Sequence, residues 1–506
     1  MMMNGANTFT GGRPDARSDA KTDGWSRLLA LAAGGLEVRT DSRLVNPGDA
    51  FVALPGAVRD GADFVGMALA RGAAWVVSST GSAAVALPAG SQATFVTREN
   101  PRKALGELAA ARYGTAKLPF PLVGITGTNG KTTVAYLLEC LLRKTGGRPG
   151  VLGTVEYRWP GHSEMASLTT PGCLALHRML SEMAGAGVTG AVMEASSHAL
   201  DQDRLAGISY DVAVLTNVTQ DHLDYHGDMD TYFASKRKLF TVCLKDPAKA
   251  VVNFDDPYGR ALLADFPGAV GYGLGDSGVP ARALRGEIVR RAASGRGMEM
   301  LMTFEGRSWT LSTPLVGRHN AQNLLAAQGA ALCLGLTVEQ LSGLADCLGA
   351  PGRLERVAND RSLSVFVDYA HTPDALENVL KALRGLDFEK VVAVFGCGGD
   401  RDRTKRPLMA AAVARFADVA VLTSDNPRHE DPMAIIEDAR PGLEGASEAV
   451  KVIIEPDRRE AIRLALGEIG PRDVLLIAGK GHEGYQQIGD VKHPFNDVIV
   501  AKELLA

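Results

Sequence analysis

The chain has 506 residues, 46% of them hydrophobic and 22% charged, and its formal net charge at pH 7 is −4. This length predicts about three or four domains with ordinary buried cores, and so small a charge argues against a nucleic-acid-binding surface or an anionic membrane partner. No apolar run approaches the ~20 residues that span a bilayer, so we expect no membrane segment.

Two further features concern the ends of the chain and its compartment. Residues 1–24 are polar and glycine-rich and lack the apolar core of a signal peptide, so we interpret them as a disordered leader. The six cysteines are scattered, without a Cys-x-x-Cys pair. We therefore expect neither disulfides nor structural zinc, as is typical of a cytoplasmic protein.

The first region, residues 25–117, alternates short β-like runs with helical stretches rich in Ala and Leu. The β-like runs are residues 50–54, 74–78 and 94–97. Residues 117–121, Lys-Leu-Pro-Phe-Pro, then form a predicted linker, because two prolines stop regular structure. This pattern predicts an α/β domain at residues 25–117.

The second region, residues 118–350, opens with an apolar run at 121–125, a glycine turn and a helical pattern. The turn reads Gly127-Thr128-Asn129-Gly130-Lys131-Thr132-Thr133. In this arrangement backbone N–H groups and the helix N-terminus cradle phosphates, the Lys reaches the terminal phosphates and the Thr hydroxyl meets Mg²⁺. Ile125 stands where the usual motif has glycine, so the loop is a variant P-loop. It predicts a nucleotide site and leaves the reaction open.

Polar residues follow two later apolar runs of this region, 190–193 and 211–215. Glu194 is placed at a strand end to hold Mg²⁺ directly or through water, although Ser196 and Ser197 also suit a simple helix N-cap. Residues 216–227 hold two His and two Asp within six positions, which favours a metal or phosphate site. Residues 232–238 suggest, from sequence alone, a solvated basic helix end.

The second region closes with a helical stretch at 320–334 and a shorter helix near 338–347. Asn320 stands at the start of the first of these helices. It either caps the helix or contacts a base, and the sequence by itself does not decide between the two roles.

The third region, residues 351–506, alternates buried-strand runs with helical patterns. The runs are residues 364–367, 391–395, 419–423, 450–454 and 474–478. This alternation predicts an open, mostly parallel sheet covered by helices, which binds ligands beyond the carboxyl ends of its strands. Polar motifs stand at those ends, at Asp368 and at residues 396–403, 423–428 and 479–483.

Taken in order, these motifs resemble the Mur ligase family of ATP-dependent, amide-forming enzymes that build the peptidoglycan stem peptide. The resemblance covers nearly the whole chain from about Leu36. Its motifs are GTNGKTT at 127, MEASSHAL at 193, NVTQDHLDYHG at 217, GRHNAQN at 317, VDYAHTPDAL at 367, GCGGDRD at 396, SDNPR at 424 and AGKGHE at 478. It implies an N-terminal UDP-binding domain, a central P-loop ATPase domain and a C-terminal Rossmann-like domain that binds the amino acid. Residues 40–43, 47–49 and 60–61 are similar to the family's uridine-binding region.

The resemblance also implies roles for single residues. ATP would be bound by the loop residues from Gly127 to Thr133 together with Asn320, Arg353 and Asp368. The catalytic set would be Lys131, Glu194, His222 and Lys236, and the metal set would be Thr132, Glu194, His222 and Lys236. Lys236 would act as a carbamate, an anion for a second Mg²⁺ and not a solvated cation. The UDP-linked substrate would contact Ser42, Thr169, Thr170, Ser197, Gln202 and Arg204.

The implied substrates are UDP-N-acetylmuramoyl-L-alanyl-D-glutamate and meso-2,6-diaminopimelate, because residues 425–428, Asp-Asn-Pro-Arg, resemble the diaminopimelate-adding members. The amino acid would be bound by Arg401, Asp425, Asn426, Arg428, Gly479 and Glu483. Arg428 suits the second carboxylate, which lysine lacks. The D-glutamate carboxylate would attack ATP to give an acyl phosphate, and the amine would then displace phosphate. We expect a cytoplasmic monomer.

Two alternatives share this scaffold. The Asp-Asn-Pro-Arg motif argues against a lysine-adding ligase, and the UDP-binding region argues against a folylpolyglutamate synthase. A nucleotide-binding regulator without catalysis would be expected to have lost Lys131, Lys236 or Glu194, and all three are present.

Overall fold

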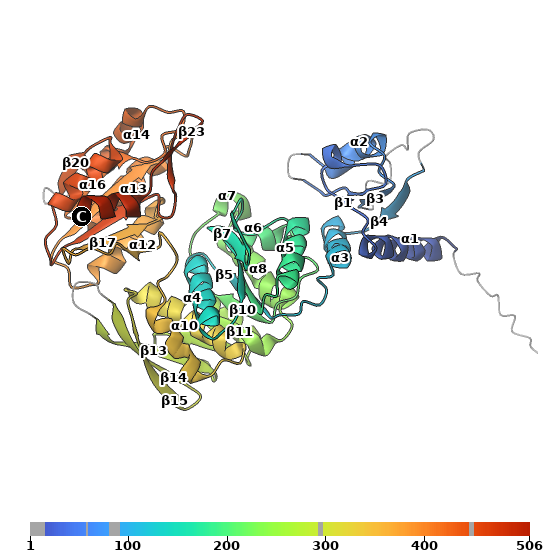
Figure 1. The fold of residues 1–506 in the computed structure, drawn as a ribbon, viewed down its shortest axis with the longest axis horizontal. Coiled ribbons are helices and arrows are strands. Elements are labelled where there is room, and N and C mark those ends of the chain that lie inside the picture. Colours follow the sequence, from blue (N-terminus) through green and yellow to red (C-terminus); the bar gives the residue numbers. More distant parts are fainter. Residues whose placement is uncertain (1–15, 57–58, 80–91, 292–296, 445–449) are drawn as a thin grey trace, which may run out of the picture. The chain divides into compact units, whose positions relative to one another are not determined.

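The computed structural model describes residues 16–56, 59–79, 92–291, 297–444 and 450–506 (Figure 1). It divides the chain into two compact units. Unit 1 comprises Met1–Pro119, Thr170–Gly187 and His198–Ser209, and unit 2 comprises Phe120–Thr169, Val188–Ser197 and Tyr210–Ala506. Helix α1 begins at Ala16, inside the segment expected to be a leader, and the rest of that segment lies outside the described residues.

Unit 1 is built on a parallel four-stranded sheet. Its strands, in spatial order, are β1 (Val38–Arg39), β2 (Ala50–Val52), β3 (Trp75–Ser78) and β4 (Thr94–Thr97). Its helices are α1 (Ala16–Ala33), α2 (Val65–Ala70), α3 (Pro101–Tyr113) and α5 (Cys173–Gly185). The core formed by α1, α3 and the sheet includes Cys173, so α5 belongs to this unit although it comes from the middle of the chain.

A buried histidine fixes α5 within unit 1. Both ring nitrogens of His177 have partners, the hydroxyl of Thr115 on one side and the carbonyl of Ala206 at 2.9 Å on the other. Gly106 of α3 lies directly against the Ala206 backbone, which leaves no room for a side chain. Close packing of this kind explains why segments distant in sequence form one unit.

Unit 2 contains an eleven-stranded sheet, and its middle strands are parallel. The spatial order is β15, β14, β13, β12, β11, β10, β5, β9, β6, β7, β8. The bounds are β5 (Leu122–Thr126), β6 (Pro149–Leu152), β7 (Glu156–Trp159), β8 (His162–Met165), β9 (Gly190–Glu194), β10 (Val212–Leu215), β11 (Ala250–Asn253), β12 (Val270–Gly273), β13 (Ala283–Arg291), β14 (Met298–Phe304) and β15 (Arg307–Thr313). Antiparallel pairs extend the sheet at both ends.

Helices α4 (Lys131–Lys144) and α10 (Arg318–Cys333) pack side by side against this sheet (Figure 1). The other helices around it are α7 (Leu223–His226), α8 (Met229–Lys238), α9 (Pro257–Asp265) and α11 (Val338–Leu341). Helix α6 (Ser197–Asp201) follows β9, and all but its first residue belong to unit 1. Strand β5 is buried along its whole length, and the apolar face of α4 with Leu137 and Leu141 covers it. The P-loop between these two elements therefore has a rigid base.

The C-terminal part of unit 2 has a six-stranded sheet in the order β16, β17, β21, β18, β19, β20. Its strands are β16 (Glu355–Arg356), β17 (Ser364–Asp368), β18 (Val391–Cys397), β19 (Val419–Ser424), β20 (Lys451–Ile454) and β21 (Val474–Ala478), and β16 alone among them is antiparallel. The hairpin of β22 (Tyr485–Ile488) and β23 (Val491–Pro494) forms a separate sheet.

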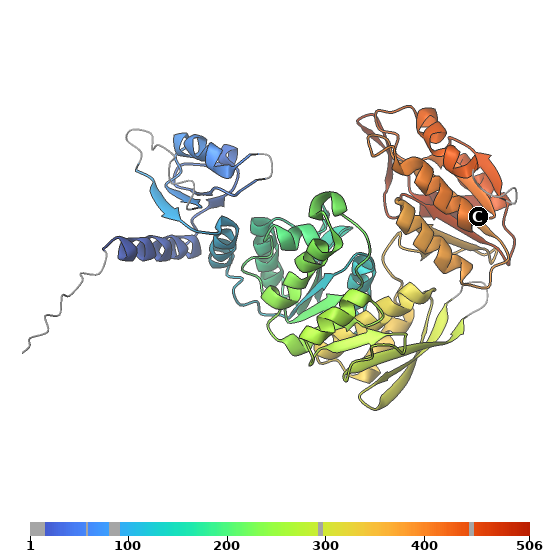
Figure 2. The same cartoon turned by 180° about the vertical axis from the view of Figure 1, so that it is seen from behind.

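Two cores enclose this six-stranded sheet. Alternate strand residues face opposite ways: Ala393 belongs to the core under α12, α13 and α14, and Val394 to the core under α16 and α17 (Figure 2). The helices are α12 (Pro373–Arg384), α13 (Lys405–Phe416), α14 (Pro432–Ala439), α15 (Pro441–Glu444), α16 (Arg458–Gly467) and α17 (Asp497–Leu505). The predicted parallel sheet with helices on its faces is confirmed.

The expectation of no disulfide is wrong. Cys140 of α4 and Cys347 are joined, with Cα atoms 6.1 Å apart, although 207 positions separate them in sequence. Cysteine spacing gave no sign of this pair because the fold, not local sequence, brings the two together. Among the described residues, no helix is long and apolar enough to cross a membrane.

Candidate active site

The phosphate-binding loop requires glycine at two positions. Gly127 has φ +146° and Gly130 has φ +87°, both in the region that L side chains rarely adopt. A Cβ at Gly127 would collide with Oγ1 of Thr216, and one at Gly130 with Oδ1 of Asn323. The loop is thus held against the end of β10 on one side and against α10 on the other.

Two lysines meet at the carbonyl oxygen of Gly127. Nζ of Lys131 donates to it at 2.8 Å and also to the carbonyl of Thr128 at 2.9 Å. Nζ of Lys236 donates to the same Gly127 oxygen at 2.9 Å. Burial lowers the pKa of both amines, and the charge of Lys131 lowers the pKa of Lys236 further.

The interpretation of residues 232–238 as a solvated basic helix end is wrong for Lys236, which is 1% exposed. Tyr232 and Lys236 are one helical turn apart and share the inward face of α8, whereas Arg237 points outward to Asp265. Sequence reasoning missed Tyr232. Its ring lies 4.3 Å from Nζ of Lys236, and its hydroxyl is 3.1 Å from Oγ1 of Thr128.

Glu194 stands at the end of β9, beside the P-loop. Its carboxylate is 1% exposed and accepts hydrogen bonds from the Thr132 hydroxyl at 3.0 Å and from the backbone and hydroxyl of Thr154. The structure therefore brings Thr132 and Glu194 of the predicted metal set together. The His222 ring lies 6.3 Å from the Tyr232 ring. Within the described residues no three His, Cys, Asp or Glu side chains form a metal-binding group.

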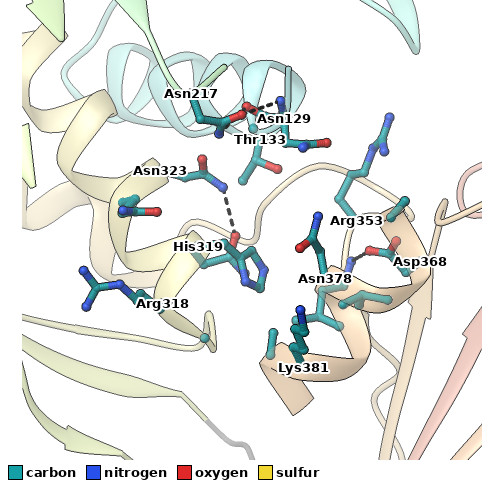
Figure 3. A pocket seen from close by; sticks show the side chains of 18 of the residues that line it. Asn129, Thr133, Asn217, Arg318, His319, Asn323, Arg353, Asp368, Asn378 and Lys381 are labelled. Atoms are coloured by element: carbon teal, nitrogen blue, oxygen red, sulfur yellow. Dashed lines mark hydrogen bonds between the residues drawn. The ribbon is translucent and has the colours of Figure 1, made fainter. Parts of the chain in front are cut away.

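A cavity of about 560 Å³ adjoins the loop (Figure 3). Six of the residues predicted to bind ATP line it: Asn129, Gly130, Thr133, Asn320, Arg353 and Asp368. Asn320 does not cap α10, because the N-cap is Gly317; its amide donates to the carbonyl of Val316 at 2.9 Å. Of its two possible roles, helix capping is excluded.

Backbone N–H groups bind Asp368, the acid on the C-terminal side of this cavity. Asp368 accepts from the N–H groups of Leu354 at 2.6 Å and Ala370 at 2.8 Å. Burial raises its pKa, and the charge of Arg353 partly offsets that rise. Figure 3 also shows His319, Asn378 and Lys381 in the lining, which sequence reasoning missed. Asn378 and Lys381 lie on α12, whose polar positions gave no sign of a site.

Four of the six predicted amino-acid-binding residues cluster at the ends of β19 and β21, where Asp425, Asn426 and Gly479 are buried and Glu483 is partly exposed. The amide of Asn426 donates to Glu483 at 2.9 Å, and the position of a Cβ on Gly479 would be 2.5 Å from Oδ2 of Asp425. Sequence reasoning missed Lys480, whose fully buried amine donates to Asn426 at 3.1 Å and to Glu483 at 3.2 Å.

The two predicted arginines flank Gly398, where β18 ends. From the position of a Cβ on Gly398, Nη1 of Arg428 is 3.0 Å away and Cγ of Arg401 is 3.5 Å away. Arg428 has φ +50° and donates to the carbonyl of Gly399 at 2.6 Å. The structure thus places cationic side chains at the end of β18, next to the acidic cluster after β19, since the two strands are paired as far as Cys397 and Ser424.

Unit 1 has a cavity of about 250 Å³ of its own, lined among others by Thr40, Arg102, Gln202 and Arg204. Arg204 donates to Gln202 at 2.7 Å and to the carbonyl of Thr170 at 3.3 Å. Ser42 is buried elsewhere in this unit, and its hydroxyl is 3.2 Å from Sδ of Met67. The other two predicted residues belong to unit 2, where Thr169 bonds Thr154 and Ser197 bonds His226.

Three family models match the chain: the Mur ligase family catalytic domain at residues 37–113, the Mur ligase middle domain at 125–331 and the Mur ligase glutamate ligase domain at 352–481. A curated relative, the UDP-N-acetylmuramoyl-L-alanyl-D-glutamate--2,6-diaminopimelate ligase of Lawsonia intracellularis, is 49% identical over 92% of this chain and 95% of its own length.

Solved structures agree. One described as a UDP-N-acetylmuramoyl-L-alanyl-D-glutamate--2,6-diaminopimelate ligase superposes with a TM-score of 0.68 at 34% identity, covering 93% of this chain and 94% of its own. The MurF ligase of Thermotoga maritima in complex with ADP shares the fold alone, with a TM-score of 0.58 at 20% identity over 90% of this chain and 95% of its own. The chain therefore belongs to the Mur ligase family.

Proposed function

We propose that the protein is an ATP-dependent ligase that adds meso-2,6-diaminopimelate to the D-glutamate of UDP-N-acetylmuramoyl-L-alanyl-D-glutamate in peptidoglycan synthesis. The names of the relatives over nearly the full chain support this assignment. The observation that carries the substrate choice is that two acids, the buried Asp425 and the partly exposed Glu483, and two arginines, Arg401 and Arg428, stand at neighbouring strand ends.

The first half of the reaction is activation of the D-glutamate carboxylate. The nucleotide lies in the cavity between the P-loop, Asn320 and the Arg353–Asp368 pair, with its phosphates along the loop. Lys131 then leaves its two carbonyl partners to meet the terminal phosphates, and the helix N-terminus at Gly130 adds positive potential. The carboxylate oxygen attacks the γ-phosphorus in line, ADP departs, and an acyl phosphate is left.

The residues beside the loop fit Mg²⁺. The Thr132 hydroxyl and the Glu194 carboxylate are hard oxygen donors in contact with each other, as this cation prefers. With His222 as the further ligand that the family resemblance implies, Mg²⁺ would offset the phosphate charge. The pocket of Lys236 fits a carbamate, because a buried amine of lowered pKa has a larger neutral fraction than an exposed lysine, and the neutral amine is the form that combines with CO₂.

The second half is amide formation. Asp425 and Glu483 hold the ammonium groups of the amino acid, while Arg428 and Arg401 bind the carboxylate at its far end through charge-assisted hydrogen bonds. The reacting amine, once deprotonated, attacks the acyl carbon, and the tetrahedral intermediate collapses with loss of phosphate. Lysine would leave a guanidinium unpaired, and sites built on such pairs reject the deficient analogue by roughly 10⁴-fold.

Within unit 1, the UDP-linked substrate is held by Thr170, Gln202 and Arg204, with Ser42 on the uridine side. The Arg204–Gln202 contact in the unit 1 cavity supports this assignment. We further propose that the enzyme acts as a monomer in the cytoplasm, where both peptidoglycan precursors and ATP are present.

A turnover assay tests the proposal. Purified protein is incubated with UDP-N-acetylmuramoyl-L-alanyl-D-glutamate, ATP, Mg²⁺ and either diaminopimelate or lysine, and phosphate and the UDP-tripeptide are measured. We expect product with diaminopimelate and little with lysine. Absence of turnover with diaminopimelate would refute the activity, and equal turnover with lysine would refute the substrate choice alone.

A further inference from the structure

A fully buried ion pair lies under the amino-acid cluster. Arg458 begins α16 and Asp497 begins the last helix, α17, and both side chains are 0% exposed. Nε and Nη2 of Arg458 donate to the two oxygens of Asp497 at 2.8 and 2.7 Å, so the contact is bidentate. Neither residue is part of the site derived above.

The same guanidinium also holds the end of β21. Nη2 of Arg458 donates to the carbonyl of Ala478 at 2.9 Å. Strand β18 pairs with β21 only as far as Val394 with Ile477. The carbonyl of the next residue, Ala478, therefore lies beyond this pairing, and Arg458 is its hydrogen-bond partner. On the other side of this peptide, the N–H of Gly479 donates to the carbonyl of Asp368 at 3.1 Å. The Ala478–Gly479 peptide is thus fixed at both its oxygen and its nitrogen.

This peptide sets the wall of the amino-acid cluster. Gly479 has φ +115°, and a Cβ there would lie 2.5 Å from Oδ2 of Asp425 and 4.0 Å from Nη2 of Arg458. Among the residues that the structure describes, nothing hydrogen-bonds Oδ2 of Asp425 or Nη1 of Arg458. An acid that accepts an ammonium group needs an oxygen without a partner, and Gly479 lies directly beside this one.

The charges around Arg458 also hold its guanidinium in place. Burial opposes the charge of Arg458, but the carboxylates of Asp497, Asp425 and Glu483 outweigh it and raise the pKa of the guanidinium above its usual value. The buried guanidinium is therefore a fixed positive charge behind the two pocket acids.

We propose that Arg458, held by Asp497, is a positioning residue for diaminopimelate: it fixes the Ala478–Gly479 peptide beside Oδ2 of Asp425. This inference rests on the proposed amino-acid pocket. The last helix of the chain is thereby coupled to substrate binding, through a contact that never touches the substrate.

The test must separate positioning from stability. Removing one partner of a buried pair leaves the other charge unpaired and destabilises strongly, whereas replacing both by apolar residues is often neutral. The decisive protein is therefore the double variant Arg458→Met/Asp497→Leu. It is accompanied by Asp497→Asn, which keeps the side-chain volume and weakens the hydrogen bonds to Arg458. Melting temperature, kcat and the KM values for ATP, the UDP-linked substrate and diaminopimelate are measured for each.

Arg459→Met is a matched control, because Arg459 pairs with Glu503 at 2.7 Å between the same two helices while both side chains are half exposed. We expect the double variant to fold, to raise the KM for diaminopimelate at least about tenfold and to leave the KM for ATP unchanged. Asp497→Asn should also raise the KM for diaminopimelate. Arg459→Met should match wild type.

Two results would overturn the positioning role. One is a wild-type KM for diaminopimelate in a folded double variant and in Asp497→Asn; the other is an equal rise in the KM values for all three substrates. Arg428→Ala, assayed alongside, separates the two proposals. If it raises the KM for diaminopimelate while the double variant does not, the positioning role alone fails. If neither does, the pocket assignment fails as well.

Discussion

Lys131 and Lys236 donate to one carbonyl oxygen, that of Gly127, at 2.8 and 2.9 Å. Two ammonium groups on one oxygen repel each other, and the pKa of Lys236 falls accordingly, with burial as the main cause. In the reaction proposed above, Lys131 would move to the terminal phosphates of ATP, and Lys236 would take the uncharged form that combines with CO₂.

Replacement of Lys236 by Ala should abolish turnover, because the P-loop then lacks the buried amine that is proposed to become the carbamate. Arg237→Ala is the control, since Arg237 is the next residue on α8 and forms an exposed pair with Asp265. ¹³C-labelled bicarbonate gives a direct readout, a carbamate carbon resonance in wild type and in Arg237→Ala that is absent from Lys236→Ala. Turnover in Lys236→Ala would contradict the carbamate role.

Gly130→Ala should weaken ATP binding. Gly130 has φ +87°, so alanine is strained there by roughly 1–2 kcal/mol, and its Cβ would also collide with Asn323 in the nucleotide cavity. Gly146→Ala makes a matched comparison, because Gly146 has the same φ of +87° with nothing within 4 Å of a Cβ. We expect a higher KM for ATP in Gly130→Ala alone. Equal effects of both variants on this KM would show that backbone strain, not the cavity, accounts for the loss.

His177 should make the enzyme sensitive to acid. Burial lowers its pKa to about 4 from an ordinary 6.5, and its bond to the Ala206 carbonyl only partly opposes this shift. The folded state therefore favours the neutral ring: the stabilisation is full above pH 6.5 and is lost as the pH falls from 6.5 to about 4, by about 3 kcal/mol. Urea unfolding of wild type and His177→Gln across this range measures it. If the difference between the two proteins does not change with pH, His177 is not held neutral.

The Cys140–Cys347 pair predicts a specific thiol count. Among the described residues the cysteines outside this disulfide are Cys173, Cys243, Cys333 and Cys397. Denatured protein prepared without reductant should therefore take up alkylating reagent at these four positions, and peptide mapping should find Cys140 and Cys347 labelled only after reduction. Labelling of Cys140 and Cys347 without reductant would mean that they are thiols in solution.

Local pattern was sufficient for the strands that build the site. Residues 94–97 and 474–478 were predicted with the bounds that β4 and β21 have, because short β-like runs between polar clusters identify strands, and β21 is buried along its whole length. The β22–β23 hairpin escaped prediction, since β23 is exposed throughout and has no apolar periodicity to signal a strand.

The site was harder to predict where a role depends on packing. Lys236 resembles a surface residue in sequence because its neighbours are Arg237 and Lys238, and only its position on α8 buries it beneath Tyr232. The pairing of Arg458 with Asp497 joins residues 39 positions apart, and no motif links them. Motifs identify the residues that face a substrate, whereas the groups behind them are found only in the folded chain.

Isotope transfer tests the central claim most directly. The UDP-linked dipeptide, labelled with ¹⁸O in the reacting D-glutamate carboxylate, is incubated with ATP, Mg²⁺ and diaminopimelate. The carboxylate oxygen that attacks the γ-phosphorus becomes the bridging oxygen of the acyl phosphate and leaves with phosphate when the amine attacks. We therefore predict one ¹⁸O atom in each phosphate released, together with the UDP-tripeptide. Phosphate without ¹⁸O, or labelled phosphate formed as readily with lysine, would contradict the account.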